Sequence, residues 1–280
     1  MRKLTKRFTK EQIKDIINLY NSGNYNCRDL SKKYDVYPSS IERLLKRNNV
    51  KIKTDISTRF QRVYHIDENY LNNIDCEEKA YFLGFFYADG YNNENRGFIK
   101  IALQEQDKDI LLKFKELFQS QNNLKFINYK TKHPKWSNQY QWYITSKKLS
   151  ARLVELGAWQ KKSLNIVFPN TEQVPENFIK PFIRGYFDGD GSFGLYGKYK
   201  SLDLGISCSN NFAESLKYFL EQKLDIKSYL KLSPKITNIK LSGKKAIKFL
   251  DWIYIDSKIH LNRKYNLYLE CKKIKCKLQN

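Results

Sequence analysis

The chain has 280 residues, enough for one large domain or two to three small ones, and 41% of them are hydrophobic and 15% aromatic, which excludes an intrinsically disordered protein. It carries 51 lysine and arginine residues against 29 aspartate and glutamate residues, a net charge of +22. A field of this sign attracts polyanions, and it favours nucleic acid as the partner. The alternative, solvated lysines in a chain of biased composition, stays open at this point.

Several features favour an intracellular protein. The five cysteines are odd in number and show no CxxC pair, which is typical of free thiols in a reducing compartment. No stretch is apolar for long enough to cross a membrane, and the basic first residues lack the apolar core of a secretion signal. We therefore expect a cytoplasmic or organellar protein that is not secreted and has no membrane partner. The three histidines are widely separated, which argues against a histidine-dependent nuclease or a zinc site.

Residues 1–50 have the pattern of a small all-α domain. Apolar residues recur at helical spacing over 10–20 and 28–34, Thr9 is placed to cap the first helix, and Pro38 begins a third. A tight turn before a basic third helix is typical of a helix-turn-helix that binds DNA. That helix would present polar and basic side chains outward: Ser39, Ser40, Arg43, Lys46 and Arg47. The alternative is an ordinary three-helix bundle with a solvated basic face.

Two short stretches of the chain have nearly the same sequence. Residues 82–90 read FLGFFYADG and residues 183–191 read IRGYFDGDG. Each is an apolar helical segment with an internal glycine, and each ends on a small residue, an aspartate and a glycine. Because the unit occurs twice, we expect a duplicated helix that places Asp89 and Asp190 as paired carboxylates about a twofold-like axis.

The residues that follow each motif repeat as well, so that each half reads helix, two strands, helix, two strands, helix. The alternating segments that predict strands are 97–103, 139–144, 201–207 and 235–241. The segments with helical spacing are 107–118, 147–156, 211–220 and 244–254. Prolines and polar residues mark a joint near 169–175. The predicted domains are therefore 1–50, a linker over 51–74, a first half over 75–168 and a second half over 169–280.

These features resemble the LAGLIDADG family of homing endonucleases in its single-chain, two-motif form, over residues 75–280. The resemblance implies an α+β fold, a pseudo-twofold duplicated αββαββα core with a saddle-shaped antiparallel sheet, here joined to the helix-turn-helix domain. It implies a monomer that cuts double-stranded DNA at a specific site and takes no small-molecule substrate. The alternative is a non-cleaving transcription regulator or an intron RNA maturase built on the same scaffold, although retention of both terminal acids argues for the nuclease.

The resemblance also carries roles onto individual residues. Asp89 and Asp190 would bind divalent metal and act in catalysis, with the carbonyl groups of Ala88 and Gly189 as further ligands. Hard oxygen ligands at a phosphodiester favour Mg²⁺, or another divalent cation such as Mn²⁺. The alternative interpretation of the two acids is that they only terminate helices. Asp188 points away from Asp190 on a helix, so we expect it to be structural or to face DNA.

The glycines inside the two motifs predict a close helix pair. Gly84 and Gly185 each cost about 1 kcal/mol of helix stability relative to alanine, which close packing of one motif helix against the other would offset. Acids at helix C-termini are disfavoured by the helix dipole, so a cation is expected nearby. We expect Ala88 and Gly189 at the tightest point of this helix interface.

Family members often carry a basic residue near each metal, and this feature does not transfer cleanly. The matching stretch of the first half begins with Gln104, and the second half has no base there. Lys100, Lys147 and Lys240 are substitutes among which the sequence does not choose. Residues 261–265 resemble a family segment that closes the second half, and the lysine-rich stretch 272–277 is expected to be solvated charge.

The outward positions of the predicted strands would read DNA in the major groove. Most such lysines contact phosphate rather than bases. The candidates outside the helix-turn-helix are Lys100, Gln104, Lys130, Lys132, Gln141, Lys198, Lys200, Lys231, Lys235 and Lys240.

Overall fold

The protein is represented by a computed structural model that describes residues 8–22, 25–50, 52, 64–131, 133–160, 165–198, 200–234 and 236–279. Two of the predicted DNA contacts, Lys132 and Lys235, and half of the predicted linker lie outside these ranges. The chain divides into two compact units, Met1–Gln61 and Arg62–Asn280. None of the helices in the described ranges combines the length and apolar character that crossing a lipid bilayer requires.

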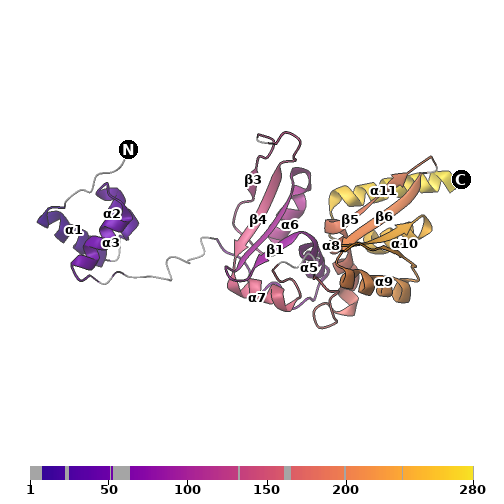
Figure 1. Cartoon of the computed structure of the whole chain (residues 1–280), viewed down its shortest axis with the longest axis horizontal. Coiled ribbons are helices and arrows are strands. Elements are labelled where there is room, and N and C mark those ends of the chain that lie inside the picture. The colour runs from indigo at the N-terminus through magenta and orange to yellow at the C-terminus, as the bar shows by residue number, and fades with distance from the viewer. Residues whose placement is uncertain are drawn as a thin grey trace. The chain divides into compact units, whose positions relative to one another are not determined.

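The first unit contains three helices: α1 (Lys10–Asn21), α2 (Cys27–Lys33) and α3 (Pro38–Arg47), drawn in indigo in Figure 1. The predicted cap is present, because Thr9 Oγ1 accepts the Gln12 amide at 3.2 Å and Gln12 Oε1 accepts the Thr9 amide at 3.1 Å. Apolar side chains from all three helices form a separate core, which contains Ile16, Leu30, Ile41 and Leu45. The predicted three-helix unit is therefore present, and DNA binding by it stays a prediction.

The second unit contains the predicted αββαββα order twice. The first half consists of α5 (Glu77–Asp89), β1 (Gly90–Asn93), β2 (Phe98–Gln104), the 3₁₀ turn η1 (Glu105–Asp107), α6 (Lys108–Leu117), β3 (Lys125–Ile127), β4 (Gln139–Thr145) and α7 (Lys147–Glu155). The second half consists of the 3₁₀ turn η3 (Glu176–Phe178), α8 (Ile179–Asp190), β5 (Gly191–Tyr196), β6 (Ser201–Cys208), α9 (Asn210–Leu224), β7 (Tyr229–Lys231), β8 (Thr237–Ser242), α10 (Lys244–Tyr254) and a closing helix α11 (Asn262–Gln279).

Each half forms its own four-stranded antiparallel sheet. The strand orders are β1-β2-β4-β3 and β5-β6-β8-β7, which are the same order in the two repeats. The registers also correspond, since Gly90 pairs with Ile101 and Gly191 pairs with Ile206 at the start of the first strand of each sheet. The duplicated α+β core is therefore confirmed.

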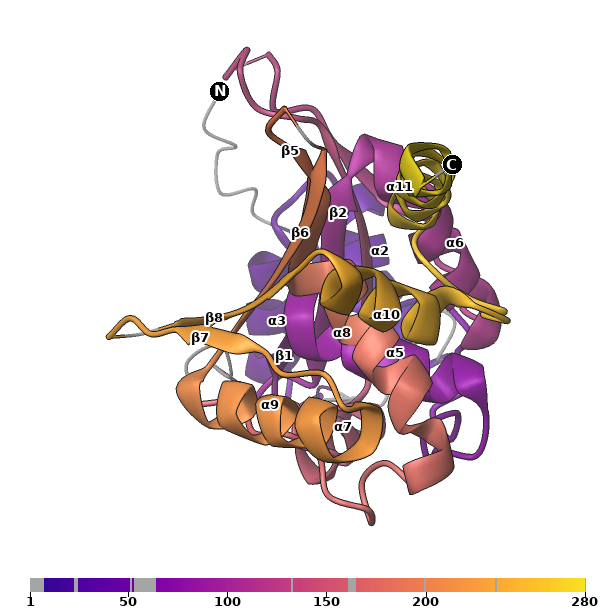
Figure 2. The ribbon, with the colours of Figure 1, turned by 90° about the vertical axis from the view of Figure 1, so that its right-hand side faces the viewer.

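The helices cover one face of each sheet. Helices α6 and α7 pack on the first sheet, and α9 and α10 pack on the second, as Figure 2 shows for the second half. Alternate residues of the strands point into these layers, such as Ile99, Ile101 and Leu103 of β2, which are buried. Helices α5 and α8 lie side by side between the two sheets (Figure 1). The opposite faces of the sheets, which we call the open faces, carry the exposed and half-exposed strand residues.

Two ion pairs of the second unit are not predicted by the sequence. Asp107 occupies the N-cap position of α6 without a side-chain cap, and its carboxylate accepts two hydrogen bonds from Arg263, at 3.1 and 3.0 Å, which joins the first half to the second. The stretch 272–277 belongs to α11, and its Lys272 is paired rather than simply solvated, because its Nζ lies 2.7 Å from Asp251 Oδ1. Among the described residues, Cys27, Cys76, Cys208 and Cys271 are free thiols, as expected.

Candidate active site

The two motif helices pack with their backbones in contact. A Cβ placed on Gly84 would lie 1.9 Å from the carbonyl oxygen of Phe182, and one placed on Gly185 would lie 2.1 Å from the carbonyl oxygen of Tyr81. The relationship is reciprocal, because each glycine meets the opposite helix near the other glycine. Only glycine allows this approach, which explains why both apolar helices contain one. The two motif helices therefore form a close and pseudo-symmetric interface.

Further along the pair, the helices end together. A Cβ placed on Gly189 would lie 2.3 Å from Ala88 Cβ and 3.3 Å from Asp89 Oδ2. The sequence predicts this as the tightest point, but Gly84 and Gly185 approach the opposite backbone more closely. The side chain of Asp89 thus lies beside the residue that precedes Asp190.

Each motif aspartate is the last residue of its helix and the last before a strand. Gly90 and Gly191 follow them in extended conformation, with φ of −77° and −86°, so that each helix passes directly into β1 or β5. A side chain on either glycine would collide with the ring of Phe86 or Phe187, at 2.3 and 2.2 Å. Unlike the buried residues 80–87 and 181–188 of the same helices, Asp89 and Asp190 are exposed to solvent. The geometry therefore presents two carboxylates at the same end of the helix pair.

Lys264, in the first turn of α11, is a site residue that sequence reasoning does not identify. Its ammonium group donates hydrogen bonds to the carbonyl oxygens of Phe187, at 2.7 Å, and Gly191, at 2.5 Å, which flank the end of α8. The side chain is buried, with 5% of the residue exposed. It supplies the cation that the helix dipole and the terminal acid favour at this position. The one sequence signal for it is the closing segment 261–265, which does not by itself indicate a base at the site.

The electrostatics of this end of the helix pair couple Lys264 to both acids. Burial lowers the pKa of Lys264 to about 8; the charge of Arg263 lowers it further, whereas those of Asp188, Asp89 and Asp190 oppose the shift. Asp190 also affects its buried neighbours. Burial and the charge of Asp190 together raise the pKa of Cys208 to about 12 and hold the pKa of Tyr186 well above its usual range. The site thus combines two exposed acids with one buried base.

The three lysines suggested from sequence make other contacts. Lys100 lies over the ring of Tyr91, 5.6 Å from its centroid, and Lys147 donates to the Glu94 carbonyl at 3.3 Å. Lys240 pairs with Gly205 on the neighbouring strand, and its side chain lies over that glycine: a Cβ placed on Gly205 would be 2.8 Å from Lys240 Nζ. Lys100 and Lys240 point outward from the open faces, and Lys147 is hydrogen-bonded to the turn between β1 and β2. Of these four lysines, Lys264 is the one whose hydrogen bonds reach the carbonyl groups at the end of α8.

Asp188 is buried, with 2% of the residue exposed, and accepts hydrogen bonds from three neighbours. The expectation that it faces DNA is therefore wrong, and its structural alternative is the one that the burial supports. Because a helix turns about 100° per residue, Asp188 and Asp190 point to different sides of α8, one inward and one to solvent.

The predicted DNA contacts of the second unit lie on or beside the open faces. Lys100, Gln104 and Gln141 project from β2 and β4, and Lys231 and Lys240 project from β7 and β8. Lys130, Lys198 and Lys200 are exposed in the turns that connect strands. On α3 of the first unit, the side chains of Ser39, Ser40, Arg43, Lys46 and Arg47 are exposed or half-exposed. The structure thus places every described candidate at the surface, and their contact with DNA remains a prediction.

A known protein family matches the chain over the same two repeats. The family described as LAGLIDADG-like domain matches residues 77–156 and 177–253, which coincide with the two αββαββα repeats and include both motif helices. The chain belongs to this LAGLIDADG-like family. No curated protein matches the chain.

Solved structures with a similar arrangement come from homing endonucleases. The meganuclease I-SmaMI bound to uncleaveable DNA is 14% identical, with a TM-score of 0.49, and the match covers 71% of this chain and 90% of that one. The LAGLIDADG homing endonuclease I-LtrWI bound to target DNA is 13% identical, with a TM-score of 0.46, and the match covers 72% of this chain and 90% of that one.

Proposed function

We propose that this protein is a site-specific double-strand DNA endonuclease whose motif aspartates hold divalent metal. The observation that carries the proposal is the placement of Asp89 and Asp190, exposed together at the ends of two helices that pack about a pseudo-twofold seam. DNA strands are themselves related by twofold symmetry. One acid for each strand would allow a single molecule to cut both strands.

The donor set fits a hard divalent cation. Within the described part of the chain, no group of three or more histidine, cysteine, aspartate or glutamate side chains is placed to form a metal cage. Mg²⁺ is usually held by one or two carboxylates with water and substrate phosphate completing its shell. Asp89 and Asp190 would supply the carboxylates, with the carbonyl groups of Ala88 and Gly189 as further donors. When bound, the cation supplies Lewis acidity toward a phosphodiester and lowers the pKa of a water.

The chain's own residues contribute charge and orientation. Lys264 uses two of its three N–H donors on the carbonyl groups of Phe187 and Gly191, which fixes the direction of the ammonium group. Its positive charge is the candidate to stabilise negative charge that develops at the site. The carboxylates of Asp89 and Asp190 keep the site anionic without metal, so that binding of DNA phosphate and binding of the cation favour each other.

DNA would lie across the two open faces. The faces carry amide, hydroxyl and lysine side chains, which suit base edges and phosphates, and the net charge of +22 supplies the long-range attraction. The two sheets differ in these side chains: Gln104 and Gln141 project from the first, and Asp203, Ser207 and Asn238 from the second. We therefore expect a target whose two half-sites differ in sequence. The α3 helix of the first unit would contact an adjacent stretch of DNA.

A non-cleaving regulator or an RNA maturase would use the same open faces without the acids. Exposure of both carboxylates at the helix ends favours the nuclease, because a purely structural acid at a helix C-terminus is unfavourable. The test is cleavage of a plasmid library that carries randomised inserts, with the purified protein and either Mg²⁺ or EDTA. With Mg²⁺, but not with EDTA, we expect linear products with staggered ends from a small set of related inserts. Binding to selected inserts with no cleavage under any divalent cation would support the regulator instead.

A further inference from the structure

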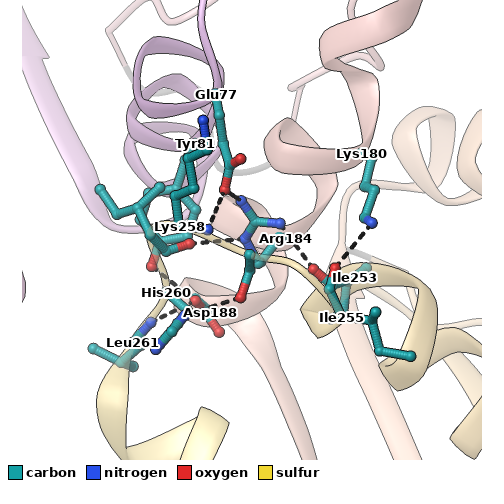
Figure 3. A network of polar contacts seen from close by, with 12 residues as sticks. Glu77, Tyr81, Lys180, Arg184, Asp188, Ile253, Ile255, Lys258, His260 and Leu261 are labelled. Atoms are coloured by element: carbon teal, nitrogen blue, oxygen red, sulfur yellow. Dashed lines mark hydrogen bonds and ion pairs between the residues drawn. The ribbon is translucent and has the colours of Figure 1, made fainter.

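One face of α8 is bonded to the segment that leads into α11. Lys180, Arg184 and Asp188 are spaced four residues apart, so they form a stripe along a single face of the helix. We call these three residues the α8 stripe. Each member makes hydrogen bonds to the backbone of residues 253–261, which run from the end of α10 to the start of α11 (Figure 3).

Arg184 is the centre of the stripe. Its guanidinium is 1% exposed and donates to the carbonyl oxygens of Ile259 and Ile253, both at 2.8 Å, and to the carboxylate of Glu77 on α5. Glu77 in turn accepts the Lys258 amide at 2.8 Å. A planar guanidinium with several hydrogen bonds fixes its partners in both distance and direction. The segment is therefore held from α8 and from α5 at once, as Figure 3 shows.

Asp188 holds the end of the segment. Its Oδ2 accepts the Leu261 amide at 2.8 Å and the Tyr81 hydroxyl at 2.7 Å, and its Oδ1 accepts the Tyr254 hydroxyl at 2.6 Å. Leu261 immediately precedes α11 and lies three residues before Lys264. At the other end, Lys180 donates to the Ile255 carbonyl at 3.1 Å. The stripe thus fixes both ends of the connection that precedes Lys264, whose ammonium group lies at the end of α8.

The first half anchors its equivalent connection differently. Tyr87 occupies on α5 the position that Asp188 occupies on α8, and its hydroxyl donates to the carbonyl of Leu156, just after α7, at 2.5 Å. Leu83 takes the position of Arg184 and is an apolar core residue. The ionic stripe is therefore a feature of the second half, and Tyr87 is its natural internal control.

We propose that the α8 stripe positions Lys264 at the candidate active site, and that it does so only when α5 is docked. The proposal rests on the proposed function in so far as Lys264 acts on DNA there. Arg184 and Asp188 are positioning residues, because they act through the 253–261 segment rather than on the substrate. Because Glu77 and Tyr81 of the first half complete their hydrogen bonds, assembly of the two halves and placement of the lysine are a single event.

Chemical labelling of lysine amines tests this directly, without DNA or metal. The full-length protein is treated with acetic anhydride, and acetylation of Lys264 is followed by mass spectrometry relative to the exposed Lys198. Buried Lys264 should label slowly in the wild type. Arg184→Met and Asp188→Asn should raise its labelling rate about tenfold or more through local opening of the segment, and Lys180→Met should raise it less. Tyr87→Phe, which leaves the segment untouched, should leave the rate unchanged.

Variants are compared well below their melting temperatures, so that global unfolding does not contribute. Asp188→Asn preserves the shape of the side chain, and Lys180→Met alters a half-exposed residue. Both variants should therefore fold, even if Arg184→Met does not. Wild-type protection of Lys264 in folded Asp188→Asn and Lys180→Met would overturn the proposal. An equal increase in Tyr87→Phe would overturn it too, since the effect would then be general loosening.

Activity provides an independent second measurement. On an insert selected by the wild type, the stripe variants should lower kcat while the Kd for DNA stays the same, because the open faces are unchanged. Equal loss of kcat and affinity would contradict a positioning role. If the wild type cleaves no DNA, the proposed function fails, and the labelling result still decides whether the stripe places Lys264.

Discussion

Gly84 and Phe182 meet at the closest approach in the seam: a side chain on the glycine would lie 1.9 Å from the carbonyl oxygen of Phe182. Gly185 and Tyr81 repeat this relationship at 2.1 Å from the opposite helix. The position of the two terminal acids follows from this packing, because the helices diverge or shift if either pair is forced apart.

Gly84→Ala and Gly185→Ala should therefore destabilise the second unit despite alanine's higher helix propensity. Overpacking typically costs about 1–3 kcal/mol, and contact with backbone atoms that cannot move aside should place the loss at or above the upper end. The measurement is urea unfolding followed by tryptophan fluorescence. Gly197→Ala is the control, because nothing lies within 4 Å of its added methyl group and only its φ of +68° is unfavourable. Equal losses at Gly84 and Gly197 would contradict the interpretation of the seam.

Lys264 should give the protein a pH-dependent stability in the alkaline range. Its pKa falls from an ordinary value of 10.5 to about 8 in the folded state. Between these values the unfolded chain binds more protons than the folded one, so the contribution of Lys264 to stability rises with pH. The difference in unfolding free energy between the wild type and Lys264→Met should shift by about 2 kcal/mol in favour of the wild type from about pH 7 to about pH 9.5.

Subtracting the variant removes the titration of other lysines and tyrosines, which both proteins share. Denaturant unfolding at a series of pH values provides the comparison. Parallel curves for the two proteins would show that the ammonium group of Lys264 is not desolvated in the folded state.

Removal of the first unit should weaken DNA binding without unfolding the second. Residues 62–280 form a compact unit with their own core, so the truncated chain should keep its melting temperature. Arg43, Lys46 and Arg47 are exposed on α3, and the salt slope of log K should fall by about 0.9 for each phosphate that the protein no longer neutralises. The full-length variant with these three residues changed to alanine is the matched control. Unchanged affinity and slope in both proteins would show that this unit does not bind DNA.

Much of this fold could be predicted from local pattern. The two motifs and the longer strands and helices repeat in sequence, and their boundaries in the structure agree to within a few residues, as for β4 and α10. The strands β1, β3, β5 and β7 could not be located individually from the sequence; three of them have only three or four residues, too few for alternation to be visible.

The site could be predicted only in part. Asp89 and Asp190 stand out because their motif is local, whereas Lys264 reaches α8 only through the folded path of α10 and α11. No spacing in the sequence indicates that Lys264 meets α8. Asp188 is similar, since its three hydrogen-bond partners come from α5, α10 and the start of α11, and only the tertiary structure brings them together.

The central claim is tested most directly by Asp89→Asn and Asp190→Asn on a selected DNA insert in Mg²⁺. These substitutions preserve side-chain shape at exposed positions, so folding and DNA affinity should be retained, while double-strand cleavage should fall at least about a hundredfold. The measurement is strand-resolved cleavage on denaturing gels, with binding assayed in parallel. Wild-type cleavage by either variant, at unchanged affinity, would show that the paired aspartates are not the catalytic acids.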